Sequence, residues 1–216
     1  MTSVKFCGLM RPEDARLAGE LGASHAGVIF ANGSRRWVST RQAKNVFSAL
    51  PGSVRKVGVF RDTPLATIVS TAAEAGLDAV QLHGAFDTAA IRELRALFSG
   101  AIWLVAGIDP ASRSLSRHVL EIATETDAVL LDTSVAGLSG GSGVAFDWLA
   151  LANDTHALSA MTPVIVAGGL TPLNVANAIR ALSPAVVDVS SGVEAAPGIK
   201  DHNLMRTFAQ AVRSAS

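Results

Sequence analysis

Several features that mark other classes of protein are scarce in this chain of 216 residues. It has one cysteine, no tyrosine and only 5% aromatic residues. A single cysteine excludes any disulfide bond within the chain, which suits a reducing compartment. The 18 Lys and Arg residues balance 18 Asp and Glu residues. The chain therefore lacks the net positive charge that attracts nucleic acid or an anionic membrane surface.

Long apolar runs are also absent. None approaches the roughly 18 residues that a membrane-spanning helix needs. The N-terminal segment MTSVKFCGLM shows neither the apolar stretch nor the cleavage pattern of a secretory signal. We therefore expect a cytoplasmic protein with no membrane or nucleic-acid partner. Apolar residues nevertheless make up 49% of the chain and charged residues 17%, which allows a large core and excludes intrinsic disorder.

Short runs rich in Val, Ile and Leu recur from end to end, and each is followed by a loop and a helical pattern. The runs are continuous rather than alternating, which is typical of parallel strands covered on both faces. They predict strands at Val4–Cys7, Ala26–Phe30, Lys56–Phe60, Ala79–Leu82, Ile102–Ala106, Ala128–Asp132, Val164–Ala167 and Val186–Ser190.

The intervening helical patterns carry start and stop signals. Thr63-Pro64 and Thr171-Pro172 each place a hydroxyl residue before a proline, which predicts a helix that begins at the proline. Asp87 is expected to cap another helix, and Gly76 to end one. Strands and helical patterns alternate eight times without a linker, so residues 1–216 are expected to form a single domain.

Eight βα units in a chain of this length predict an α/β protein with the (β/α)8 TIM-barrel fold. The alternative is an open, doubly wound sheet. That fold is disfavoured because CGLMRPED, and not G-x-G-x-x-G, follows the first strand. The segment after Asp132 contains SVAGLSGGSGVAFDW, which predicts an enlarged loop on the catalytic face of the barrel.

Two glycine-containing segments follow the last two predicted strands. In TIM barrels a phosphate is frequently bound there, by backbone N–H groups that glycine leaves accessible. Ordinary βα turns also use glycine, but two such segments at the two expected places favour a phosphate site. The candidate phosphate-binding residues are Gly168, Gly169, Ser190, Ser191 and Gly192.

Cys7 and Asp132 end two strands that lie on opposite sides of the expected barrel mouth. A thiol and a carboxyl group form an acid–base pair when their pKa values are suitably shifted. A lone cysteine is more commonly a small buried apolar residue, whereas a carboxylate that ends an apolar strand needs a specific reason. Arg36 could bind a substrate carboxylate with two hydrogen bonds, although an ordinary surface role fits its spacing equally well.

Two further titratable residues have open roles. Lys5 stands two residues before Cys7, so both side chains point to the same side of the strand. We hypothesise that Lys5 lowers the pKa of the thiol; the alternative is that Lys5 pairs with Asp188 inside the barrel. His83 is expected to be structural. No His, Cys or carboxylate cluster has metal-ligand spacing, so no metal is expected.

Seven segments together resemble the phosphoribosylanthranilate isomerase family over almost the whole chain. They are KFCGLMRPEDA, GVIFANGSRRWVS, KVGVF, AVQLHG, VLLDT with GGSGVAFDW, VIVAGGLTPLNVANAI and VDVSSGVEAAPGIKD. The resemblance implies a TIM barrel that acts in tryptophan biosynthesis. It also implies conversion of N-(5-phosphoribosyl)anthranilate into 1-(2-carboxyphenylamino)-1-deoxyribulose 5-phosphate, an Amadori rearrangement without a cofactor.

The resemblance also implies residue roles. Cys7 matches the family's general base and Asp132 its general acid, while Arg36 matches the arginine that contacts the anthranilate carboxylate. The phosphate loops fall on the glycines and serines named above. Small departures affect loop detail: Trp37 stands where the family often has Tyr, Arg35 where it often has Pro or Lys, and GGSG where GGTG is commoner.

Two other functions remain open. The first is the related isomerase of histidine biosynthesis, or a dual-specificity form, whose bisphosphate substrate calls for a second phosphate loop. The segment FRDTP after the third strand offers no glycine pair, and Cys7 stands where that enzyme is expected to have an aspartate. The second is a non-catalytic barrel that binds a phosphorylated ligand. A monomer is expected because no helix shows an unclaimed apolar face.

Overall fold

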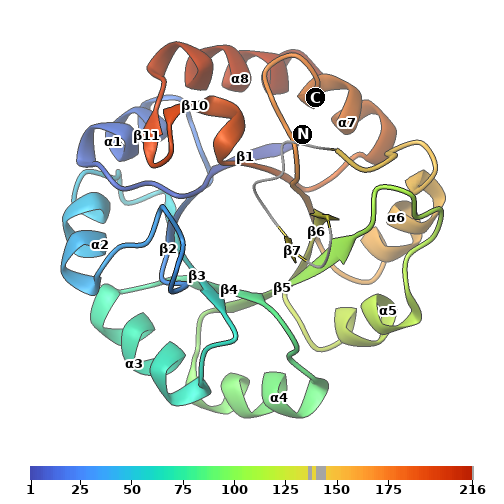
Figure 1. Ribbon diagram of the computed structural model, residues 1–216, viewed down its shortest axis with the longest axis horizontal. Helices are drawn as coiled ribbons and strands as arrows, with labels where there is room; N and C mark the ends of the chain where they lie inside the picture. Colours follow the sequence, from blue (N-terminus) through green and yellow to red (C-terminus); the bar gives the residue numbers. More distant parts are fainter. Residues whose placement is uncertain (136–137, 140–144, 216) are drawn as a thin grey trace.

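The eight apolar runs form a closed ring of parallel strands (Figure 1). The computed structural model describes residues 1–135, 138–139 and 145–215. Strands lie side by side in the order β5-β4-β3-β2-β1-β9-β8-β6, and β5 pairs with β6 to close the ring. The predicted TIM barrel is therefore confirmed. The barrel strands are β1 (Ser3–Phe6), β2 (His25–Ile29), β3 (Arg55–Arg61), β4 (Ala79–His83), β5 (Ala101–Ile108), β6 (Ala128–Val135), β8 (Val164–Val166) and β9 (Val186–Val189).

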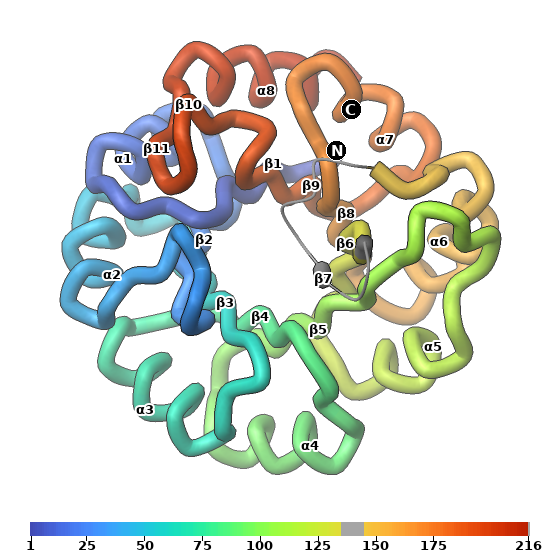
Figure 2. The backbone as a smooth tube through the Cα atoms, viewed as in Figure 1, coloured from blue at the N-terminus to red at the C-terminus, as the bar shows by residue number. Residues whose placement is uncertain are grey.

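Helices surround the ring of strands on the outside, and the tube drawing shows the chain progressing once around the barrel (Figure 2). Each helix packs its apolar side against the strands, since helix residues such as Ile68, Leu94 and Phe208 are buried in one core with them. The helices are α1 (Pro12–Glu20), α2 (Thr40–Phe47), α3 (Leu65–Ala75), α4 (Thr88–Leu97), α5 (Arg117–Ala123), α6 (Ala152–Ser159), α7 (Val175–Leu182) and α8 (His202–Ala215).

Among the described residues, three short strands lie outside the barrel ring. β7 (Leu138–Ser139) pairs antiparallel with β6, and β10 (Glu194–Ala196) pairs with β11 (Ile199–Lys200) in a hairpin. The hairpin follows the 3-10 helix η1 (Ser191–Val193), directly after β9. Strands of two or three residues carry no hydrophobic period, so sequence patterns could not predict them. The GGSG part of the predicted enlarged loop lies outside the described residues.

Both Thr-Pro predictions of helix starts are wrong. Pro64 has an extended ψ of 141° and is the last residue before α3, so it belongs to the preceding loop. Thr171-Pro172 also precedes its helix, because the Thr171 N–H donates to the Asn174 side chain at 2.7 Å and α7 begins only at Val175. The other signals are confirmed: Asp87 caps α4 by accepting from the Ala90 N–H, and Gly76 ends α3 with a φ of 65°.

The side chains inside the barrel change from apolar to polar along the strands. Its N-terminal part is apolar, and a second core cluster fills it. Toward the C-terminal end, residues at alternate positions of the same strands become polar, such as Gln81 and His83 on β4, Asp132 on β6 and Asp188 on β9. These side chains share the inward face of their strands. The members of the apolar cluster are Val57, Ala79, Trp103, Ala128, Leu130, Ile165, Ala167 and Val186.

Candidate active site

One cavity at the C-terminal end of the strands brings together every site residue predicted from the sequence. Its volume is about 410 Å³, which is large enough for one small organic ligand. In TIM barrels this end carries the chemistry. The predicted residues that line the cavity are Cys7, Arg36, Asp132, Gly168, Gly169, Ser190, Ser191 and Gly192.

Lys5 lies fully buried in the barrel interior, below the cavity. Its Nζ donates to Asp188 Oδ2 at 2.7 Å and to Gln81 Oε1 at 3.0 Å. Burial opposes the charge on Lys5, but the charges of Asp188 and Cys7, together with their hydrogen bonds to Lys5, outweigh burial and raise the pKa of Lys5. The alternative raised for Lys5, a pairing with Asp188, is therefore formed in the structure.

The Cys7 thiol lies beside the same ammonium group. A Cβ atom built on Gly27 would be 3.0 Å from Cys7 Sγ and 3.3 Å from Lys5 Nζ, so both groups occupy the space that a side chain at Gly27 would fill. Burial raises the pKa of Cys7, and the positive charges of Lys5 and Lys200 only partly offset it. Lys5 thus acts in the direction we hypothesised, but the net shift favours the neutral thiol in the free protein.

Asp132 is a buried carboxyl group with 6% of its surface exposed. Burial and the nearby negative charge of Asp188 raise the pKa of Asp132 to about 7. The group is therefore partly protonated at neutral pH, which suits a general acid. Gly168 allows the next loop to approach β6 closely, because a Cβ at Gly168 would lie 2.9 Å from Asp132 Oδ1 and would overlap Thr133.

The two candidate phosphate loops pack directly against each other. A Cβ atom at Gly192 would overlap the carbonyl oxygen of Leu170, so only glycine fits there. Gly169 has a φ of 63°, in the left-handed region that favours glycine. The Ser190 hydroxyl, which lines the cavity, is buried without a hydrogen-bond partner among the described residues. A buried polar atom of this kind is normally satisfied by a ligand or water.

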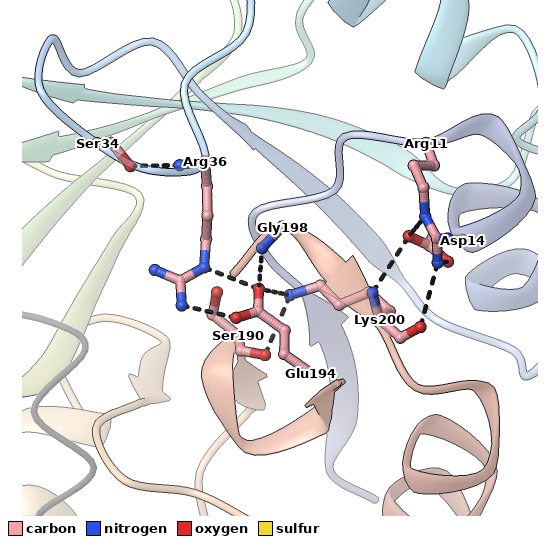
Figure 3. A network of polar contacts seen from close by, with 8 residues as sticks. All are labelled: Arg11, Asp14, Ser34, Arg36, Ser190, Glu194, Gly198 and Lys200. Atoms are coloured by element: carbon pink, nitrogen blue, oxygen red, sulfur yellow. Dashed lines mark hydrogen bonds and ion pairs between the residues drawn. The ribbon is translucent and has the colours of Figure 1, made fainter. Parts of the chain in front are cut away.

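Arg36 is already paired within the chain. Its Nε and Nη2 donate to the two carboxylate oxygens of Glu194 at 2.8 and 2.7 Å. Figure 3 shows the remaining guanidinium nitrogen turned away from Glu194. Sequence reasoning missed Glu194, although it stands within the segment VDVSSGVEAAPGIKD, because no spacing rule links it to an arginine 158 residues away.

Gln81 and His83 line the cavity on the side of β4. Gln81 Nε2 lies 3.0 Å from His83 Nε2, so one histidine nitrogen is already engaged. Burial, followed by the positive charges of Arg61 and Lys5, lowers the pKa of His83 to about 3. The imidazole is therefore neutral, which agrees with a structural role. Within the described ranges, no three His, Cys, Asp or Glu side chains are grouped to hold a metal ion.

Comparisons with known proteins agree on one family. The family described as N-(5'phosphoribosyl)anthranilate (PRA) isomerase matches residues 4–211. A protein of Rubrobacter xylanophilus named N-(5'-phosphoribosyl)anthranilate isomerase is 40% identical over 214 residues, which cover 99% of this chain and 100% of the relative. In the part of the chain that the structure covers, no helix is long and apolar enough to span a membrane.

Solved structures give the same result. Phosphoribosyl anthranilate isomerase of Thermotoga maritima has a TM-score of 0.85 and 33% identity, covering 99% of this chain and 100% of its own. Another isomerase of this kind, in complex with reduced 1-(o-carboxyphenylamino)-1-deoxyribulose 5-phosphate, has a TM-score of 0.81 and 31% identity over 99% and 100% of the two chains. Together with the barrel and its cavity, these matches show that the chain belongs to the N-(5'-phosphoribosyl)anthranilate isomerase family.

Proposed function

We propose that this chain converts N-(5-phosphoribosyl)anthranilate into 1-(2-carboxyphenylamino)-1-deoxyribulose 5-phosphate, the isomerisation step of tryptophan biosynthesis, with Asp132 as general acid and Cys7 as general base. The observation that carries the proposal is the convergence of these two groups on one cavity that also holds the glycine-rich loops. The raised pKa of Asp132, about 7, supports its part.

Asp132 performs the first step. Its protonated carboxyl group donates a proton to the furanose ring oxygen while the bond between C1 and that oxygen breaks. The electron pair of the anthranilate nitrogen then forms an iminium bond to C1. Because the carboxyl group is buried, the neutral form needed for this step persists to about pH 7.

Cys7 performs the second step. As a thiolate it removes the proton from C2, and the electron pair left behind neutralises the iminium to give an enolamine. The enolamine then tautomerises to the ketone. Burial disfavours the thiolate before substrate binds, so the cationic iminium adds to the positive charge of Lys5 in stabilising it once the ring has opened. The ring-opening step therefore comes first.

The two ends of the substrate bind at opposite sides of this pair. The phosphate binds at Gly168, Gly169, Ser190, Ser191 and Gly192, where the unpartnered Ser190 hydroxyl is one donor. The anthranilate carboxylate binds Arg36. Phosphate or sulfate soaked into crystals is expected against the backbone N–H groups of Gly169, Ser191 or Gly192. An ion bound only elsewhere at the barrel mouth would contradict this placement.

A turnover assay tests the proposed function. The purified chain is given phosphoribosylanthranilate, and the reaction is followed by fluorescence. Measurable turnover is expected on this substrate and negligible turnover on the bisphosphate of histidine biosynthesis, which has no anthranilate carboxylate. Substantial activity on the bisphosphate would indicate the dual-specificity form, and binding without turnover would indicate a ligand-binding barrel.

We further propose that the chain works as a monomeric single-domain enzyme in the cytoplasm, without a cofactor. All the site residues named above come from one chain, which supports a site that is complete in the monomer. One structural neighbour is described as mutually generated monomers of a dimeric isomerase, so both states are represented among similar proteins. Sedimentation at micromolar concentration is expected to give the mass of one chain; a stable dimer would contradict the proposal.

A further inference from the structure

A partly buried ion pair joins the loop after β2 to the hairpin after β9. The Arg36 and Glu194 side chains that form it are 18% and 5% exposed. Both oxygens of the Glu194 carboxylate accept from the guanidinium, which fixes the plane of one group against the other. The direction in which Arg36 can meet a ligand is therefore set by Glu194.

Glu194 is itself held from a second side. The fully buried Lys200 Nζ donates to Glu194 Oε1 at 2.9 Å, and the Gly198 N–H reaches the same oxygen at 3.3 Å. Lys200 Nζ also donates to the Ser190 carbonyl oxygen at 3.0 Å. One ammonium group thus ties the partner of Arg36 to the loop proposed to bind phosphate (Figure 3).

The group around Glu194 holds more basic than acidic side chains. Burial by itself would raise the pKa of Glu194, but the hydrogen bonds from Arg36 and the charge of Lys200 outweigh it and lower that pKa. Glu194 is therefore a carboxylate at neutral pH, and it accepts from two basic groups, Arg36 and Lys200. Burial lowers the pKa of Lys200, although the charge of Glu194 acts in the opposite direction. Two basic side chains thus share one carboxylate at the edge of the cavity, which favours a ligand that brings a further negative charge.

The Arg36 side chain also packs against the backbone at Gly8. A Cβ atom at Gly8, where φ is 68°, would lie 2.6 Å from Arg36 Cδ and 3.0 Å from Ser190 Oγ. Arg36 therefore passes directly over Gly8 on its way to Glu194. The guanidinium nitrogen that Glu194 does not use points away from the pair, and Arg36 lines the cavity.

From this arrangement we propose that Glu194, held by Lys200, is a positioning residue that aims Arg36 at the substrate carboxylate. The inference rests on the proposed function and adds a determinant of substrate affinity to it. An ion pair, at the surface or in the interior, adds little to stability compared with apolar packing, so the place of this pair beside the cavity is better explained by the orientation it gives to Arg36. An arginine ordered in advance loses less freedom when substrate binds.

The test compares Glu194→Gln, Arg36→Met and the double variant. We expect Glu194→Gln to raise KM for phosphoribosylanthranilate by roughly tenfold or more with little change in kcat, because it weakens binding of the carboxylate and leaves Asp132 and Cys7 in place. The double variant should be no worse than Arg36→Met alone, since Glu194 acts through Arg36. Binding of ribulose 5-phosphate, which has no aromatic carboxylate, should stay within about twofold of wild type.

Asp14→Asn is the matched control. Asp14 is also a buried carboxylate, and it pairs with Arg11 and His202 and accepts from the Lys200 backbone N–H, but it does not contact Arg36 (Figure 3). The Asp14→Asn variant should have a lower thermal unfolding midpoint than wild type and an unchanged KM for phosphoribosylanthranilate. An equal rise in KM in both carboxylate variants, additive effects in the double variant, or a wild-type KM in Glu194→Gln would each overturn the inference.

Two further measurements keep the test decisive. Direct binding of reduced 1-(o-carboxyphenylamino)-1-deoxyribulose 5-phosphate needs no turnover, so weaker binding to Glu194→Gln than to wild type supports the inference even if the proposed reaction fails. Should Glu194→Gln not fold, Lys200→Met removes the group that holds Glu194 and is expected to weaken the same binding by a smaller factor. Unchanged binding in Lys200→Met would then contradict the inference.

Discussion

The two ends of the barrel interior are built from the same strands but in opposite ways. The N-terminal end is packed with apolar side chains such as Val57, Trp103 and Ile165. At the C-terminal end, buried polar and ionisable groups such as Lys5 and Asp132 take their place. The change occurs within single strands: β6 runs from Ala128 through Leu130 to Asp132 on one face.

This difference separates stability from chemistry. Burial of apolar area stabilises the folded chain by about 25 cal/mol per Å², whereas the polar end lowers stability. The pKa of Asp132 is raised from 3.8 to about 7, which means that the folded chain disfavours the ionised form of this carboxyl group. A shift of this size costs on the order of a few kcal/mol above neutral pH. Loss of stability at a functional site is a common trade-off.

The largest expected effect comes from removing the base at the polar end. Cys7→Ser is expected to lower kcat by about 10²- to 10⁴-fold, because serine is nearly isosteric but a far poorer base. The affinity for the reduced product analogue should change little. Steady-state kinetics and equilibrium binding check this prediction, and a wild-type kcat in Cys7→Ser would remove Cys7 from the mechanism.

The pH profile of kcat/KM should show that the productive protonation state is a minor form of the free enzyme. The productive form has Asp132 protonated and Cys7 ionised, which is the opposite of the order favoured by their pKa shifts. The rate should therefore rise about tenfold per pH unit up to roughly pH 7, stay level, and fall above the raised pKa of Cys7.

The opposite profile would be equally informative. If Cys7 were already a thiolate below the pKa of Asp132, kcat/KM would be level in acid and would fall above about pH 7. A measurement from pH 5 to 10 separates the two cases. The second profile would show that Lys5 overcomes the effect of burial on the thiol.

The smallest effect is expected at the apolar end. Ile165→Val removes one methylene group from the buried cluster, and it should lower the free energy of unfolding by about 0.5–1.5 kcal/mol. Its kcat should equal that of wild type, because Ile165 lies in the apolar part of the barrel. Chemical denaturation and an activity assay test this pair of outcomes; a large loss of kcat would break the separation between the two ends.

The barrel could be predicted from local sequence patterns, because short apolar runs are enough to identify buried parallel strands. Most residues of the barrel strands are apolar, and the (β/α)8 topology places the C-terminal ends of all strands at one mouth. Cys7, Asp132 and Gly168 therefore meet in one cavity although they are far apart in the chain. The Thr-Pro predictions failed because proline fits the loop before a helix as well as its first turn.

Other features depend on contacts that no local pattern encodes. Glu194 meets Arg36 only because β10 and β11 fold back beside the loop after β2. The position of Lys5 relative to Cys7 was predictable from their two-residue spacing. The net pKa shift of Cys7 was not, since burial within the closed barrel outweighs the neighbouring charge.

The most direct test of the contrast between the two ends is Asp132→Asn, assayed for turnover and for stability at pH 5 and pH 8. The pKa of Asp132 is raised in the folded chain, so wild-type stability should fall as pH rises from about 4 through about 7. Asparagine does not titrate and escapes this loss. Between pH 5 and pH 8, the free energy of unfolding of wild type should therefore fall by roughly 2–3 kcal/mol relative to that of the variant. The kcat of the variant should be about 10²- to 10⁴-fold lower than that of wild type. An active variant, or one whose stability falls with pH as steeply as that of wild type, would contradict the account.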